Sequence, residues 1–295
     1  MNIKTINLFA KSSERSRESY NAMKKPIASI IMTTYNAPQH LALALAGLQV
    51  QTETNFELHI ADDGSSSETS EVVEEFMQRA PFSVVYSWQQ DLGYRKTKIL
   101  NEAIRKAKSD YFIFIDGDCV CHKDFVANHL KYRQKGYYLA GRRVELGPEY
   151  SASLTPDMVL RGELNRPNLG VLLSCIKKDS SYFHRCFPVY NSTLRQLLRM
   201  DQVDDMKGCN FSVDRESLFK INGFDEDFEG YAREDTDLEL RMQYLGLKIK
   251  SLKGLAVQYH VWHPRLPESD NNKRKLKATS TDTNPACKNG LVKHA

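Results

Sequence analysis

The sequence contains no apolar run long enough to cross a membrane. Its longest mostly apolar stretch, residues 41–50, is about half the ~20 residues that a transmembrane helix needs. The N-terminal segment MNIKTINLFAKSSERSRESY has neither the apolar core nor the cleavage site of a signal peptide. We therefore expect a cytoplasmic protein.

A strong charge of one sign and a metal-binding cysteine pattern are also missing. The formal net charge is +4, with much of the positive excess at residues 273–277, whereas nucleic-acid-binding proteins carry a stronger and better-organised basic face. No nucleic-acid partner is expected. Among the six cysteines, Cys119 and Cys121 form a Cys-x-Cys rather than a Cys-x-x-Cys, and no second pair matches a zinc spacing. Thiol redox chemistry and structural zinc are not expected.

The first half of the chain does contain a regular alternation of strand-like and helix-like patterns. Short apolar or β-branched runs lie at residues 28–36, 56–65, 83–88 and 111–116, with helical patterns between them. This alternation predicts βαβ units and therefore an α/β, Rossmann-like fold with a mostly parallel central sheet flanked by helices. Asn36 is expected to cap the first helix, with Pro38 in its first turn.

The second half is less regular. No helical or strand period persists from about residue 140 to 205, whereas a strand and a short helix, a second helix and a final strand pair are predicted between residues 208 and 260. We expect a single domain over residues 26–265 with an irregular region in its second half. A flexible leader is expected over residues 1–25, and a basic, disordered tail over residues 266–295.

Two acidic motifs directly follow predicted strands, at the edge where open parallel sheets bind ligands. Asp62 and Asp63 precede a Gly-Ser-Ser turn, and a carboxylate there can accept hydrogen bonds from a base or a ribose. An ordinary capped turn is the alternative. Asp116-Gly117-Asp118 follows the most apolar strand, where two carboxylates are costly to bury unless a positive charge such as Mg²⁺ or Mn²⁺ lies between them. A solvated Asp-Gly turn is the alternative here.

Two further motifs have both a chemical and a structural interpretation. Glu234 and Asp235 open a predicted helix, where acidic residues commonly complement the helix dipole, but one of them can also act as a general base. His260 and His263 lie at the end of the last predicted strand. A neutral imidazole there is most often structural, yet it can complete a Mn²⁺ site that an aspartate begins.

In combination these motifs resemble family 2 glycosyltransferases. The segments ASIIMTTYN, ADDGSSSE, WQQDLGYRKTKILNEAI, FIDGDC, GCNFSVDRESLFKINGFDEDFEGYAREDTDLELR and YHVWHP follow that family's order. The chain looks most similar to the bacterial group typified by the N-terminal domain of chondroitin polymerase. Its second half also resembles a segment shared with β-1,4-galactosyltransferases. The resemblance implies a GT-A fold, with a nucleotide-binding half over residues 26–125 and an acceptor-binding half over residues 126–265.

The resemblance also implies roles for individual residues. Donor nucleotide and diphosphate contacts are implied for Thr34, Tyr35, Asn36, Asp62, Asp63, Gly93, Tyr94, Arg95, Lys98, Asp116, Gly117 and His263. The implied ligands of Mn²⁺ or Mg²⁺ are Asp118 and His260, with Asp116 beside them. Asp235 is implied as the catalytic base and Glu234 as a contact of sugar hydroxyls. Arg142 and Arg143 are weaker candidates for donor or acceptor contacts.

The implied reaction is the inverting, metal-dependent transfer of a hexose or N-acetylhexosamine from a UDP-sugar to a glycan hydroxyl, in bacterial surface polysaccharide or lipopolysaccharide synthesis. A lipid-linked acceptor would give the basic tail a role at the inner membrane, while a solvated tail is the simpler interpretation. A sugar nucleotidyltransferase would favour a glycine-rich, lysine-bearing loop, which residues 30–38 lack. A non-catalytic carbohydrate-binding or assembly subunit would be signalled by loss of the Asp-x-Asp or of the base, and both are present. Residues 229–233 depart from the family pattern, so the donor sugar is not defined.

Overall fold

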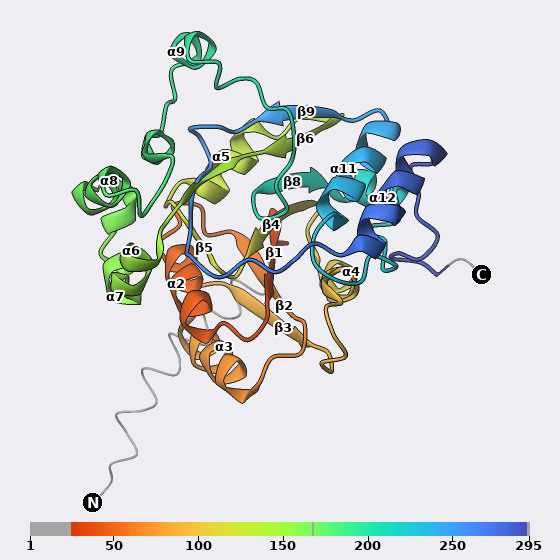
Figure 1. The fold of residues 1–295 in the computed structure, drawn as a ribbon, viewed down its shortest axis with the longest axis horizontal. Helices are drawn as coiled ribbons and strands as arrows, with labels where there is room; N and C mark the ends of the chain where they lie inside the picture. Colours follow the sequence, from red (N-terminus) through yellow and green to blue (C-terminus); the bar gives the residue numbers. More distant parts are fainter. Residues whose placement is uncertain (1–24, 167, 294–295) are drawn as a thin grey trace, which may run out of the picture.

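The computed structural model describes residues 25–166 and 168–293. Its main sheet has seven strands in the order β3-β2-β1-β4-β8-β6-β9, and only β8 runs antiparallel to its neighbours (Figure 1). These strands are β1 (Ala28–Thr34), β2 (Phe56–Asp62), β3 (Ser83–Trp88), β4 (Tyr111–Asp116), β6 (Tyr137–Ala140), β8 (Phe211–Asp214) and β9 (Lys248–Ser251). The predicted α/β fold with a mostly parallel sheet is confirmed.

Helices cover both faces of this sheet because its central strands are apolar on both sides. In β1, Ile30 and Met32 pack with one group of helices, whereas Ile31 between them packs with the other. The first group is α2 (Pro38–Gln49), α3 (Ser67–Arg79) and α5 (Phe125–Tyr132), and the second is α4 (Lys96–Lys106), α10 (Arg215–Lys220) and α11 (Glu234–Tyr244). Burial on both faces explains the unbroken apolar runs in the sequence.

A second, three-stranded sheet adjoins the first. It consists of β5 (Cys119–Cys121), β10 (Val257–His260) and β7 (Arg142–Glu145), in that order. The predicted final strand pair is therefore wrong, because β9 lies at the edge of the main sheet while β10 is the centre of the second one. The turn between them lets the chain change sheets, which period-2 patterning alone does not reveal.

The irregular region forms a lobe of short helices beside the second sheet. Its elements are α6 (Pro148–Ser153), α7 (Pro156–Leu160), η1 (Glu163–Asn165), α8 (Leu169–Ile176), η2 (Phe183–Cys186) and α9 (Ser192–Leu197). Figure 1 shows α8 and α9 projecting away from the sheets. None of these helices exceeds eight residues, which explains why no helical period was visible.

Two local predictions need correction or lie outside the described residues. Pro38 opens α2 as expected, but Ala37 rather than Asn36 is the N-cap residue. Asn36 has φ 44°, and its side-chain oxygen accepts a hydrogen bond from Ser66 N (2.9 Å), so it links two loops instead. The leader expected over residues 1–25 lies outside the described residues except for Lys25.

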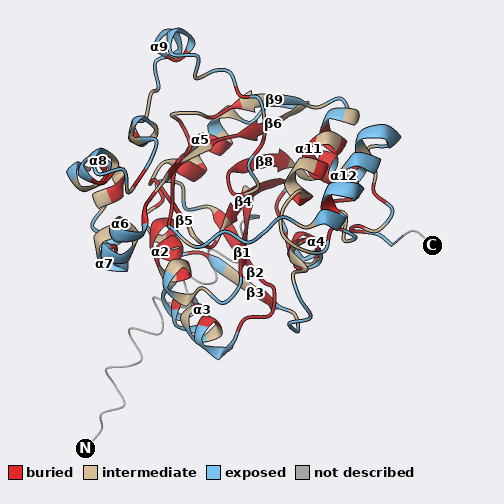
Figure 2. Cartoon of the chain, viewed as in Figure 1, coloured by how far each residue is buried: buried red, intermediate tan, exposed pale blue. Residues whose placement is uncertain are grey.

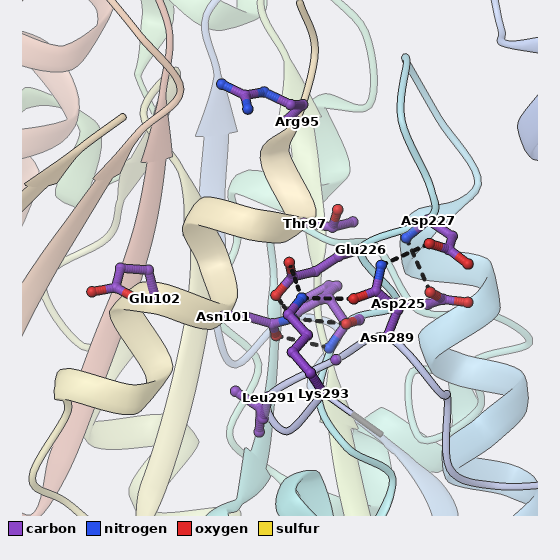
Figure 3. A network of polar contacts seen from close by, with 12 residues as sticks. Arg95, Thr97, Asn101, Glu102, Asp225, Glu226, Asp227, Asn289, Leu291 and Lys293 are labelled. Carbon is purple, nitrogen blue, oxygen red and sulfur yellow. Dashed lines mark hydrogen bonds and ion pairs between the residues drawn. The ribbon is translucent and has the colours of Figure 1, made fainter. Parts of the chain in front are cut away.

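The tail expected to be disordered is instead ordered up to residue 293. It forms α12 (Asp270–Asp282), where Asn272 is fully buried and donates to the carbonyl oxygens of Gly230 (2.9 Å) and Ala232 (2.8 Å). The residues beyond α12 then pack beside α4: Lys293 contacts Glu226 (2.5 Å), which also accepts a hydrogen bond from Asn101 (Figure 3). No helix in the described part of the chain is long and apolar enough to span a membrane.

A buried carboxylate of β2 links the start of β1 to the residues that precede β4. Glu57 of β2 is 1% exposed and accepts hydrogen bonds from Ser29 Oγ (2.5 Å) and Lys108 N (2.6 Å), with His59 Nε2 at 3.3 Å. Burial by itself would raise the pKa of Glu57, but the contacts with His59, Ser29 and Lys108 outweigh it and lower the pKa to about 2. The carboxylate therefore stays charged in the folded protein well into the acid range.

Replacing this carboxylate should reduce acid sensitivity as well as stability. The unfolded pKa of glutamate is about 4.3, so the contribution of Glu57 is present above that pH and is lost as the pH falls towards 2. Glu57→Gln should lower the free energy of unfolding by about 1–3 kcal/mol at pH 7 and flatten its dependence on pH between about 5 and 2. Urea denaturation over a pH series measures both effects. The exposed Glu75→Gln is the matched control, and an acid slope equal to wild type in Glu57→Gln would contradict the assignment.

Candidate active site

The Asp-x-Asp motif lies where the chain passes from the main sheet to the second one. β4 ends at Asp116 and β5 begins at Cys119, so only two residues join the sheets. Gly117 N donates to Thr33 O (2.7 Å), and a Cβ at position 117 would lie only 2.8 Å from that oxygen. The turn therefore requires glycine, and it places Asp116 and Asp118 in different surroundings.

Asp118 meets two histidines at the end of β10. Asp118 Oδ2 is 3.1 Å from His263 Nε2 and 3.5 Å from His260 Nε2, and one ligand atom from each of the three residues lies within 4.8 Å of the others. Val261 N donates to Asp118 O (2.8 Å), which fixes β10 against the turn. Glu145 of β7 is paired with His260 in the sheet, and its Oε2 lies 3.0 Å from His260 Nδ1. Glu145 thus orients the imidazole so that Nε2 faces Asp118.

The protonation of this cluster reflects its geometry. Burial would lower the pKa of His260, but its contacts with Asp118 and Glu145 raise it to about 9. Asp118 is affected in the opposite sense: burial would raise its pKa, and hydrogen bonds from His260 and His263 hold it well below the usual range. Protons on the two imidazoles therefore balance the negative charge of Asp118, and a divalent cation bound by the three residues could take their place. This donor set fits Mn²⁺ better than Mg²⁺, because Mg²⁺ prefers oxygen ligands alone.

Asp116, predicted to lie beside the metal, is directed elsewhere. Its Oδ1 accepts hydrogen bonds from Thr33 Oγ1 (2.8 Å) and Lys96 Nζ (3.0 Å), and it is not part of the three-residue cluster. Lys96 Nζ also lies 3.5 Å from Glu234 Oε1. Burial would lower the pKa of Lys96, but the charge of Asp116 and further contacts raise it well above its usual value. The ammonium thus bridges the first aspartate of the motif and the start of α11.

The predicted catalytic pair lies on the other side of this lysine. Asp235 Oδ2 accepts a hydrogen bond from Gly208 N (3.2 Å), and a small pocket is lined by Asp116, Lys96, Glu234 and Asp235 together with apolar residues. Burial raises the pKa of Glu234, which Lys96 partly offsets, and Glu234 Oε2 is buried without a hydrogen-bond partner. The structure therefore brings Glu234 and Asp235 to the end of β4, as predicted.

The turn before this pair is strained. Ala232 and Arg233 both have positive φ (73° and 79°), which costs of order 1–3 kcal/mol for each residue without a special environment. Asn272 of α12 holds the turn through Gly230 O and Ala232 O. The tail therefore supports the backbone from which Glu234 and Asp235 project.

The two aspartates after β2 have separate tasks. Asp62 is fully buried: its Oδ1 accepts from Gly64 N (3.0 Å) and Ser65 N (2.8 Å), and its Oδ2 accepts from Tyr86 (2.7 Å). These bonds leave it to stabilise the turn, so the expected direct nucleotide contact of Asp62 is not supported. Asp63 accepts from Arg95 N (2.7 Å) and therefore links this turn to the loop before α4.

The remaining nucleotide-side candidates surround these turns. Tyr35 is 49% exposed and its hydroxyl donates to Asp91 (2.9 Å), while Thr34 Oγ1 is buried without a hydrogen-bond partner. Gly93 has φ 87°, and Tyr94 packs edge-on against Tyr231 (6.0 Å between ring centroids). These residues flank the same ends of β1 and β2.

Three predicted residues are placed away from any open ligand position. Lys98 is exposed on α4 and lies outside both polar clusters described above. Arg142 is paired with Asp205, and Arg143 donates to Glu145 (2.8 Å) and to the thiol of Cys209. Arg143 thus supports Glu145, and both arginines already have partners within the protein.

Sequence reasoning missed Lys96 and Glu145. Lys96 had a detectable signal, because it lies four and seven residues before Leu100 and Ala103 on the buried stripe of α4, whereas Lys98 lies off that stripe. Glu145 had no comparable signal. Its strand was not predicted, and it is far in sequence from His260.

The arrangement of two sheets around an Asp-x-Asp turn is the GT-A fold. Among solved structures, the chain resembles the mannosyltransferase PcManGT from Pyrobaculum calidifontis in complex with GDP-Man and Mn²⁺ (TM-score 0.56, 14% identity, 93% of this chain and 80% of that one). It also resembles S. aureus TarS 1-349 in complex with UDP-GlcNAc (TM-score 0.54, 15% identity, 86% and 66%). At this identity the likeness shows the fold.

Within that fold class the chain belongs to glycosyltransferase family 2, whose model matches residues 29–219. A second model, the N-terminal domain of galactosyltransferase, matches residues 191–264. The relatives include the uncharacterized glycosyltransferase YfnE of Bacillus subtilis (28% identity over 80% of this chain) and a chondroitin synthase of Escherichia coli (26% over 79%). The chain spans 65% and 34% of the length of these two relatives. The predicted resemblance is confirmed.

The role of Lys96 can be tested by comparison with its neighbour. Lys96→Met leaves Asp116 and Glu234 without their shared positive charge, so it should lower the free energy of unfolding by about 2–3 kcal/mol at pH 7. The loss should be smaller at pH 5, where Glu234, with its raised pKa, binds a proton more readily. Urea denaturation at both pH values measures the difference. Lys98→Met should change stability by less than about 0.5 kcal/mol, and equal losses in the two variants would refute the bridging role.

Proposed function

We propose that the chain catalyses the inverting, metal-dependent transfer of a hexose or N-acetylhexosamine from a UDP-sugar to a hydroxyl of a glycan acceptor. One observation carries the proposal. The Asp116-Gly117-Asp118 turn separates a cation site, formed by Asp118, His260 and His263, from a pocket that contains Asp235. A donor diphosphate at the first site and an acceptor hydroxyl at the second would lie on opposite sides of the transferred sugar.

The cation site suits a leaving diphosphate. Asp118, His260 and His263 would hold Mn²⁺, and its Lewis acidity would offset the negative charge that develops on the departing UDP. Glu145 keeps the imidazole of His260 directed towards this site, and such supporting contacts commonly affect metal affinity 10- to 100-fold. His263 is less buried than His260, so it is the histidine better placed to reach the diphosphate as well.

The nucleotide would lie across the ends of β1 and β2. Asp63, held at the N-terminus of α4 by Arg95 N, is the candidate contact for uracil and ribose. Thr34, Tyr35 and Asn36 form the facing loop. Asp116 and Lys96, which line the pocket, are then placed beside the sugar hydroxyls. A uridine nucleotide is proposed from the resemblance of the sequence motifs to the chondroitin-polymerase group. Of the structures that share this fold, TarS 1-349 is known in complex with UDP-GlcNAc and PcManGT with GDP-Man.

The transfer step itself needs a base. Asp235 would accept the proton of the acceptor hydroxyl while the hydroxyl oxygen bonds to the anomeric carbon and the bond from that carbon to the diphosphate breaks. A single displacement of this kind inverts the anomeric configuration. Glu234 is paired with Lys96 Nζ (3.5 Å), so it is better suited to hydrogen-bond a sugar hydroxyl.

The acceptor is proposed to be a growing bacterial surface polysaccharide or lipopolysaccharide, carried on a lipid at the cytoplasmic face of the inner membrane. This rests on relatives such as the chondroitin synthases of E. coli and Pasteurella multocida. The α12-supported turn directly precedes Glu234 and Asp235 and would help to define the donor sugar. The lobe of short helices, which packs on β10, would help to define the acceptor.

A panel of nucleotide sugars tests the donor site. Incubated overnight with Mn²⁺, the protein should release UDP from one UDP-sugar, with no release in EDTA. Asp118→Ala should remove both the release and Mn²⁺-dependent UDP binding, because it deletes the carboxylate that the two histidines share. Calorimetry measures the binding and a coupled assay the release. Metal-independent UDP binding that survives in Asp118→Ala would count against the cation site and favour a non-catalytic module.

The base is tested separately from donor binding. Asp235→Asn keeps the hydrogen bond from Gly208 N but cannot take a proton, so transfer should fall about 100-fold or more. Affinity for UDP with Mn²⁺ should stay within about twofold, since the cation site is unchanged. Asp205→Asn, a surface carboxylate outside the pocket, is the control. Full activity in Asp235→Asn, or loss of UDP binding, would exclude the role as base.

A further inference from the structure

The lobe of short helices exposes an unusual amount of apolar surface. Of the eighteen large hydrophobic residues exposed in the described chain, ten lie between Leu160 and Leu198. They form outward stripes: Leu169, Leu173 and Ile176 on α8, and Leu194, Leu197 and Leu198 on α9 and its C-cap. Leu169 and Ile176 are each 67% exposed and Leu197 is 78% exposed. Exposed apolar residues gathered in this way mark an interaction surface.

The apolar stripes are not the lobe's packing face. The inner side of the lobe packs on the second sheet through Leu164, Val171 and Cys186, which join a cluster with Tyr259 of β10. Leu169 and Ile176 are not part of that cluster and are exposed, and Figure 2 shows exposed residues along α8 and α9. The core of the domain is therefore complete without them.

Basic residues border both stripes. Residues 160–200 contain seven lysines and arginines but two acidic residues, whereas the whole chain has a formal charge of only +4. Lys177 and Lys178 follow α8 and Arg199 follows α9, all exposed, and among the described residues none of the three forms an ion pair. Basic residues in the tail differ, since Lys273 pairs with Asp270 (3.0 Å) and lies near Glu268.

We infer that the outer face of α8 and α9 is a membrane-contact surface that binds the interface of an anionic lipid bilayer. Leucine and isoleucine side chains that enter the headgroup region beside lysine and arginine are the features that interfacial helices use. A second copy of the chain is a poorer occupant, because a symmetric contact would bring Lys177 and Lys178 towards their own equivalents. The assignment places the membrane contact on the lobe and not on the basic tail, which the sequence offered as an alternative to a solvated tail; Figure 1 shows the lobe on the opposite side from α12.

The location also suits the reaction, and this part rests on the proposed function. The lobe is packed against β10, which carries His260 at its end. Contact of α8 and α9 with the bilayer would keep the cation site and the Asp235 pocket close to the surface from which a lipid-linked glycan projects. The lipid contact itself requires neither donor nor acceptor.

Vesicle flotation with the full chain tests the surface. Wild type should bind vesicles of phosphatidylcholine with phosphatidylglycerol and bind pure phosphatidylcholine about 30-fold less or weaker still. Leu169→Glu/Ile176→Glu and Leu197→Glu should each weaken binding to the anionic vesicles about tenfold or more. Lys177→Gln/Lys178→Gln should weaken it by up to about 30-fold, the contribution of two basic residues at about 1 kcal/mol each. Met77→Glu, an exposed apolar residue on α3, and Lys273→Gln/Lys275→Gln in α12 are the matched controls and should bind as wild type does.

Each contrary result identifies a different error. No binding to anionic vesicles, or equal binding by the lobe variants and Met77→Glu, overturns the assignment. A tail variant that loses as much as the lobe variants places the contact on α12. Concentration-dependent dimerisation that Leu197→Glu abolishes, measured by light scattering without vesicles, assigns the surface to a second copy. Mn²⁺-dependent UDP binding measured on the same samples shows that the variants are folded, and its failure in wild type would refute the proposed function without affecting the vesicle result.

Discussion

The close approach of Gly117 to the end of β1 is the constraint on which the site depends. Because its amide bonds to Thr33 O and no side chain fits there, the chain must turn between the two sheets within two residues. The two aspartates of the motif then have different partners: Asp118 faces the histidines at the end of β10, and Asp116 faces Lys96. A side chain at position 117 would meet Thr33 O and displace the turn that directs the two carboxylates to different partners.

The same turn brings several carboxylates close together, and their negative charge must be balanced by neighbouring residues. Asp116, Asp118, Glu145, Glu234 and Asp235 gather around the two strand ends, and buried carboxylates are unfavourable without partners. Cationic side chains pair with most of these carboxylates. Lys96 lies between Asp116 and Glu234, the histidines lie at Asp118, and Arg143 lies at Glu145. Asp235 differs because its hydrogen bonds come from Gly208 N and from the amide and hydroxyl of Thr236. It is therefore the carboxylate of this group that no cationic side chain of the described residues pairs with.

The sequence revealed those parts of the molecule that follow local periodicity. The strands β1 to β4, their helices, and the placement of Asp116, Asp118 and Asp235 at element ends all follow from alternating patterns and turn residues. Pairings between distant segments were not predictable in this way. Glu145 reaches His260 only because β7 and β10 are neighbours in a second sheet, and Asn272 looked like part of a polar tail although it supports the turn before Glu234.

The tail and the lobe show why composition alone does not distinguish two basic segments as candidates for membrane contact. Both are rich in lysine and arginine, but in α12 the polar groups have partners: Asn272 is buried, Thr279 donates to Asp237 (2.7 Å), and Lys273 pairs with Asp270. These contacts hold the turn before Glu234, so detachment of α12 to bind lipid would release the strained backbone at Ala232 and Arg233. The exposed apolar residues of α8 and α9 make no comparable contacts with the rest of the described chain. A segment whose exposed apolar residues are not needed for folding is the one that can enter a lipid interface without disturbing the active site.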